Sequence, residues 1–126
     1  MKYVSFELAK KLKEKGFPQG NREDFRNYYY KISDGLQMAI VASNGEEVEW
    51  YCPDISEVLK WLRETHNIHI NIYFFKSNGN TELYWAYSVE NIKDDFEYDW
   101  LYSTRHDTYE AAALAGIEYV LDNILI

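Results

Sequence analysis

Apolar residues recur with two different periods along this 126-residue chain. A helical period, with apolar positions three and four residues apart, marks roughly residues 5–15, 54–65 and 108–124. A period of two, typical of half-buried strands, marks residues 68–75 and 94–102. The pattern therefore predicts three helices separated by extended segments.

Each predicted helix carries signals for its ends or for its buried side. Ser5 can cap the first helix, and Gly16 and Pro18 follow as stop signals. Gly116, among the alanines of the last helix, should let that helix lie close to a sheet. The predicted buried positions are Val4, Leu8, Ala9, Leu12, Ile55, Val58, Leu59, Leu62, Ala113, Ile117, Leu121 and Ile124.

Turn signals divide the remaining segments into strands. Between Tyr28 and Trp50, turn residues at 33–35 and 43–45 separate short β-prone runs, which predicts a three-strand meander. After the strand at 68–75, Asn78 and Gly79 predict a tight hairpin loop. The resulting register sets Phe74 opposite Leu83, Ile72 opposite Trp85 and Ile70 opposite Tyr87, all on a core face.

The segment at 94–102 alternates acids with aromatic residues and predicts a third antiparallel strand. Its aromatic residues would face the core, and its acids would keep an edge strand soluble. The whole pattern predicts an α+β fold in a single domain over 1–126, with an antiparallel sheet of about three to six strands packed with helices.

Composition limits where the chain could act. Hydrophobic residues make up 47% and aromatic residues 17%, enough apolar surface to fold without a partner. No apolar run reaches the roughly 18 residues of a membrane span, the start lacks the apolar centre of a signal peptide, and Cys52 is the only cysteine. We therefore expect a cytoplasmic protein without membrane attachment.

The net charge of −8 argues against direct binding of nucleic acid, which depends on Lys and Arg contacts to phosphates. An acidic surface could instead occupy a nucleic-acid-binding protein by imitating its polyanion, or it could simply keep the chain soluble. The acids concerned are Glu46, Glu47, Glu49, Asp94, Asp95, Glu97 and Asp99.

Residues suited to catalysis or metal binding are few. Cys52 precedes a predicted helix without a base nearby in sequence, so a small buried residue is favoured over a nucleophile. His66, His69 and His106 with Asp107 could supply metal ligands, but their spacing does not require them to converge. We therefore assign no catalytic residue, no metal and no cofactor.

One sheet face is a candidate interaction surface. His69, Tyr73, Phe75 and Tyr84 lie opposite the predicted core face. They could form a platform that stacks against bases, sugars or aromatic residues of a partner. Alternatively, the N-terminal helix and the segment from Tyr28 to Trp50 could cover these aromatic residues. The covered arrangement is favoured, because large exposed apolar patches are uncommon in monomers.

The chain also resembles two known groups of proteins. From residue 54 onward, the order helix, three strands, helix is similar to the double-stranded RNA-binding domain, and "YEAAALAGIEYVL" looks like its last helix. The position of that domain's phosphate-binding lysines is occupied by Arg105 with Asp107 and Glu110. Segments 8–19, 51–64 and 108–125 resemble a family of small uncharacterised proteins of gut bacteria, prophages and mobile elements, which implies a phage-type accessory role and no activity.

These observations favour a protein that acts by binding an unidentified protein partner, through His69, Tyr73, Phe75 and Tyr84 or through the acidic residues Asp94, Asp95, Glu97 and Asp99. The alternative is a small enzyme or ligand-binding protein that uses Cys52 and nearby histidines or the aromatic face. The apolar end of the chain also allows a homodimer.

Overall fold

The computed structural model describes residues 3–20, 27–33, 37–42, 50–76, 83–91, 96–100 and 105–125. They form three helices and two antiparallel three-stranded sheets, which confirms the predicted α+β class. The chain divides into an N-terminal unit, residues 2–54, and a C-terminal unit, residues 55–126. That the whole chain forms one domain stays a prediction. No helix within the described ranges is long and apolar enough to span a membrane.

The N-terminal unit begins with helix α1, Phe6–Glu14, close to its predicted bounds. The Ser5 hydroxyl caps it by accepting a hydrogen bond from the Leu8 N–H at 3.2 Å. At the other end Gly16 adopts a φ of 88°, and the Phe17 N–H donates to the Leu12 carbonyl at 2.9 Å. This is a Schellman motif, and its two apolar residues, Leu12 and Phe17, are both buried.

The sheet of this unit contains β1, Tyr28–Ser33, β2, Gln37–Ala42, and β3, Trp50–Cys52, in the order β2-β1-β3. The predicted meander is therefore wrong, because β3 pairs with β1 and not with β2. Contacts between residues distant in sequence hold β3 beside β1. Tyr29 and Tyr51 lie opposite each other with ring centroids 5.3 Å apart, and the Gln19 side chain accepts a hydrogen bond from the Tyr51 N–H at 3.0 Å.

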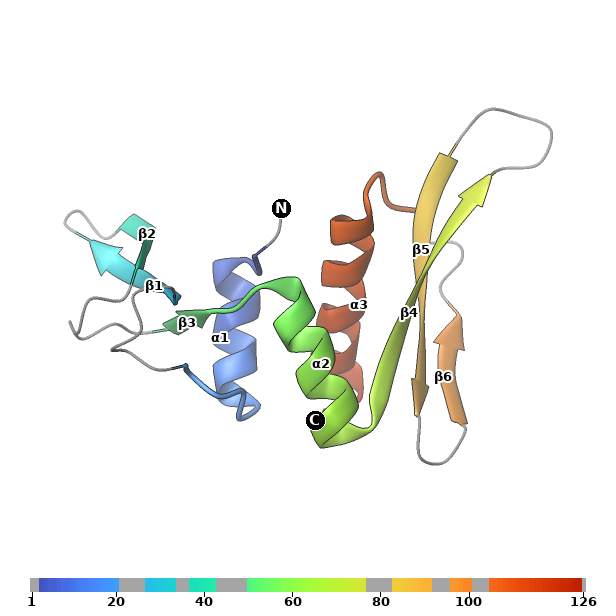
Figure 1. Ribbon diagram of the computed structural model, residues 1–126, viewed down its shortest axis with the longest axis horizontal. Helices are drawn as coiled ribbons and strands as arrows, with labels where there is room; N and C mark the ends of the chain where they lie inside the picture. The colour runs from blue at the N-terminus through green and yellow to red at the C-terminus, as the bar shows by residue number, and fades with distance from the viewer. Residues whose placement is uncertain are drawn as a thin grey trace. The chain divides into compact units, whose positions relative to one another are not determined.

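The C-terminal unit consists of α2, Ile55–His66, the strands β4, Ile68–Lys76, β5, Leu83–Asn91, and β6, Phe96–Trp100, and α3, Tyr109–Asn123. The sheet order is β4-β5-β6, and α2 and α3 lie on the same face of it (Figure 1). Asn67, with a φ of 57°, is the only residue between α2 and β4. Both predicted helices are confirmed, and the predicted strand at 94–102 is confirmed over its described residues, 96–100.

Helix α3 packs directly against β4 and β5. The Thr108 hydroxyl caps it by accepting a hydrogen bond from the Ala111 N–H at 3.0 Å. A Cβ atom on Gly116 would lie 2.8 Å from Cγ2 of Ile70 and 3.2 Å from the ring of Tyr87, so only glycine permits this approach. Other buried residues of this core are Ile55, Val58, Leu62, Ile68, Val89, Ala113, Ile117, Val120 and Leu121.

The register of the β4–β5 hairpin differs from the predicted one by two residues. Phe74 lies opposite Trp85, Ile72 opposite Tyr87 and Ile70 opposite Val89. The last described pair is Lys76 with Leu83, and the predicted Asn78–Gly79 loop lies outside the described residues. A shift of two preserves the face of every side chain, which is why the predicted faces agree with the sheet although the predicted partners are wrong.

Candidate interaction surface

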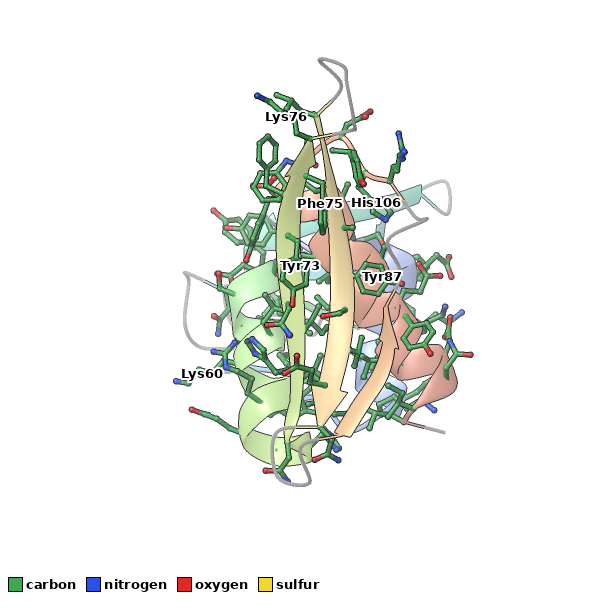
Figure 2. The ribbon with its side chains drawn as sticks, turned by 90° about the vertical axis from the view of Figure 1, so that its right-hand side faces the viewer. Lys60, Tyr73, Phe75, Lys76, Tyr87 and His106 are labelled. Atoms are coloured by element: carbon green, nitrogen blue, oxygen red, sulfur yellow. The ribbon has the colours of Figure 1, made fainter. Side chains whose placement is uncertain are left out.

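The sheet of the C-terminal unit presents one face away from α2 and α3. We call this face the outer face; it carries His69, Asn71, Tyr73, Phe75, Tyr84, Ala86, Ser88 and Glu90. Figure 2 looks onto it, with Tyr73 and Phe75 in front of the sheet and the two helices behind it. Coverage of this face by residues of the N-terminal unit stays a prediction.

Aromatic side chains form a continuous row on the outer face. The rings of Tyr73 and Phe75 have centroids 5.9 Å apart, and Phe75 stacks on Tyr84 at 5.5 Å with 18° between the planes. The Arg105 guanidinium lies over the Tyr84 ring at 4.5 Å, a cation–π contact. The structure thus brings together three of the four predicted aromatic-face residues, Tyr73, Phe75 and Tyr84.

His69 lies on the same face but outside this row. It is paired with Glu90, near the opposite end of the hairpin. At about 3.3 Å per residue, its Cα is about 13 Å from that of Tyr73 and about 20 Å from that of Phe75. Polar side chains occupy the space between, where Asn71 donates to the Ser88 hydroxyl and Ser88 donates to the Tyr73 hydroxyl, both at 3.4 Å. His69 therefore does not join the aromatic row.

The predicted acidic surface cannot be assembled from the described side chains. Asp94 and Asp95 lie outside the described residues, and Glu97 and Asp99 belong to β6, of which only the backbone is described. In the sheet, Glu97 pairs with Glu90 and Asp99 pairs with Val89. The register shifts between these two pairs, so the alternation of residues 96–100 does not run unbroken along β5. The acidic surface stays a prediction.

A second group of apolar side chains lies on the helix side of the sheet, at the hairpin end. We call this group the end cluster; its members are Phe74, Leu83, Trp85 and Tyr109. The Trp85 ring contacts the ring of Phe74 at 4.8 Å and that of Tyr109 at 5.7 Å. Phe74 is 54%, Leu83 50% and Tyr109 41% exposed. Phe74 and Leu83 therefore lie on the predicted face of the sheet, but the prediction that they are buried in the core is wrong.

The exposure of the end cluster follows from the lengths of the elements. Nine residues of strand extend about 30 Å, whereas the 15 residues of α3 extend about 22 Å and the 12 of α2 about 18 Å. Helix α3 begins at Tyr109, beside Trp85, so the hairpin continues beyond the helical layer. The predicted bounds did not contain this signal, because a strand over 68–75 and a helix over 108–124 would both extend about 26 Å.

The candidate nucleophile Cys52 lies in the N-terminal unit and is buried. Its thiol donates to the Val4 carbonyl at 3.8 Å, and the Tyr30 hydroxyl donates to the same carbonyl at 2.6 Å. Burial raises the pKa of Cys52, and the hydrogen bond with Tyr30 lowers it by less. Burial, with a smaller contribution from Cys52, also raises the pKa of Tyr30. A protonated, buried thiol is the opposite of what nucleophilic catalysis needs.

The three histidines do not gather into a metal site. His69 lies on the outer face, His66 packs edge-on against the Trp61 ring at 4.7 Å, and the backbone of His106 exchanges two hydrogen bonds with Trp85. The Nε2 atoms of His66 and His106 are buried without a hydrogen-bond partner in the described part of the chain. Across the same ranges, no group of three His, Cys, Asp or Glu residues could hold a metal ion.

Comparisons with protein-family models, with curated proteins and with solved structures gave no match for this chain.

Proposed function

We propose that this protein acts by binding another protein through the end cluster. The observation that carries the proposal is the exposure of Phe74, Leu83 and Tyr109, each 41–54%, around the connecting ring of Trp85. Contiguous exposed apolar groups of this kind are unfavourable in water and mark interaction surfaces. Aromatic residues are also the side chains that most often supply the binding energy of protein interfaces.

The charge of the chain indicates the chemistry of the partner. With a net charge of −8, the protein attracts basic proteins over distances at which apolar contacts do not act. Close in sequence to the end cluster, three acids outnumber two basic residues: Glu82, Asp107 and Glu110 against Lys76 and Arg105. We therefore propose a basic partner that inserts an apolar segment at the end cluster. The phage-type accessory role belongs to this same proposal.

The test compares capture of partners by two variants with matched chemistry. Leu83→Glu places a charge in the end cluster, and Ile40→Glu makes the same change at a residue of similar exposure, 47%, in the N-terminal unit. Tagged wild-type and variant proteins are used to capture proteins from the native cell extract. The affinity of any captured partner is then measured with purified proteins by calorimetry.

We expect Leu83→Glu to weaken binding at least about tenfold, or about 1.4 kcal/mol, because it buries an unpaired charge at an apolar contact. Ile40→Glu should bind like the wild type. Circular dichroism of both variants controls for folding. A partner that binds Leu83→Glu and wild type equally would refute the end cluster as the binding surface. A wild-type affinity that is unchanged between low and high salt would refute the basic partner.

A further inference from the structure

The two edges of the C-terminal sheet have different protection against pairing with another strand. Exposed sheet edges are usually protected by short length, by irregular register or by charged residues. Strand β6 shows these features: it has five residues, its register with β5 shifts once, and its sequence includes Glu97 and Asp99.

Strand β4 forms the other edge and lacks these features. It has nine residues, it pairs with β5 without interruption from Ile68 to Lys76, and its sequence contains no acid and no proline. The only Lys or Arg is Lys76, at its last position. Among the described residues, β5 is the only strand that pairs with β4. A long, regular, mostly apolar edge of this kind favours the addition of another strand.

We infer that β4 pairs antiparallel with β4 of a second copy of this chain, which joins two three-stranded sheets into one of six strands. A two-fold axis at Ile72 gives the longest overlap, because all nine residues are then paired. On the helix side, Ile72 lies opposite Ile72 of the second copy and Phe74 opposite its Ile70. On the outer face, Phe75 lies opposite His69 and Tyr73 opposite Asn71.

The charges of the chain favour a second copy at this edge in particular. Two chains of net charge −8 repel each other, so pairing is favoured at an edge strand whose own sequence has no acid. Strand β4 supplies such an edge, whereas pairing through β6 would place Glu97 and Asp99 near the same residues of the other copy. In the β4 pairing the two Lys76 residues lie about 26 Å apart, well beyond the Debye length of about 8 Å.

This pairing goes beyond the proposed function and is compatible with it. Phe74 lies on the edge strand, and the second copy would cover part of its exposed surface. Leu83 lies on the middle strand and Tyr109 on α3, so both stay available to a partner protein. Because the strands run in opposite directions, a dimer would present two end clusters at its two ends, and a multivalent partner would bind it more tightly.

The experiment measures the mass in solution by light scattering coupled to size-exclusion chromatography. We expect twice 15.0 kDa for the wild type. Phe74→Glu should reduce the mass to 15.0 kDa, since it places a charge opposite Ile70 of the second copy. Leu83→Glu is the matched control, because Leu83 is about as exposed as Phe74 but lies on the middle strand and not on the edge strand. This variant should remain a dimer.

A cross-linking measurement tests the register without relying on a disruptive variant. Ile72→Cys sets two thiols opposite each other at the two-fold axis, and oxidised glutathione should then join the two chains within the dimer. Leu83→Cys is the control and should not cross-link efficiently. A wild-type mass of 15.0 kDa over about a hundredfold range of concentration would overturn the inference. Masses that grow beyond a dimer, or a Phe74→Glu variant that stays dimeric, would overturn it as well.

Discussion

The close approach of α3 to the sheet predicts that Gly116→Ala destabilises the protein. In most helices this change is favourable, because alanine has a helix propensity about 1 kcal/mol better than glycine. Here the added Cβ would lie 2.8 Å from Cγ2 of Ile70 and 3.2–3.3 Å from two ring atoms of Tyr87. Both neighbours belong to the core, so neither can move away into solvent.

The expected magnitude is the difference between these two effects. Adding a methyl group to a well-packed core costs typically about 1–3 kcal/mol, since neighbouring atoms and the backbone must shift. Subtracting the gain of about 1 kcal/mol in helix propensity leaves a net loss of about 1 kcal/mol. For a chain of this size, this corresponds to a decrease in Tm of about 4 °C.

The assay is urea unfolding followed by circular dichroism, combined with a double-mutant cycle. Ile70→Leu conserves volume but has no Cγ2 atom, so it should relieve part of the contact with the new Cβ. We expect the double variant to be more stable than the sum of the two single changes predicts. If Gly116→Ala instead raises the free energy of unfolding by about 1 kcal/mol, helix propensity acts alone and the close packing of α3 on β4 and β5 is refuted.

Three further predictions concern caps and buried groups. Thr108→Ala should lower the free energy of unfolding by about 1 kcal/mol, measured by urea unfolding, because the Ala111 N–H loses its acceptor; an unchanged midpoint would contradict the cap. Cys52 should react with iodoacetamide at neutral pH far more slowly than a free thiol, because it is buried and burial raises its pKa. It should reach the rate of a free thiol only in denaturant, and fast labelling of the folded protein would show an accessible thiolate. The folded state keeps the protons of Tyr30 and Cys52 above the pH at which the unfolded chain releases them. Their contribution to the free energy of unfolding should therefore be constant below about pH 8 and fall as the pH rises beyond about 9. Tyr30→Phe should flatten this decrease in urea unfolding across the pH series, and an equally steep decrease would assign the effect to other groups.

Sequence patterns were sufficient for elements whose signals are local. The cap at Ser5, the positive φ of Gly16 and the apolar stripes of the helices all depend on residues within a few positions of each other. The order β2-β1-β3 depends on the pairing of Tyr29 with Tyr51 and on the contact of Gln19 with β3. These contacts join residues 22 to 32 positions apart, and no turn signal specifies them.

The hairpin shows which kind of error a pattern can detect. Alternation excludes a register shift of one, because that shift would move Ile70 and Ile72 to the other face. It permits a shift of two, which keeps every face and exchanges only the partners, as in the observed pairing of Phe74 with Trp85. Alternation also carries no information on where the covering helix begins, so it did not predict the exposure of Phe74 and Leu83.

The connection between α2 and β4 limits how this chain can change in evolution. Asn67 alone joins His66, the last residue of the helix, to Ile68, the first of the strand, and its positive φ suits asparagine or glycine. A substitution at Asn67 changes only the connection itself, but the connection has no further residue that could accommodate an insertion. It would have to be absorbed by β4, where it would exchange the two faces of the strand and direct Ile68 and Ile70 away from the helix side of the sheet. We therefore expect natural relatives to vary the residue at this position and to conserve the length of the connection.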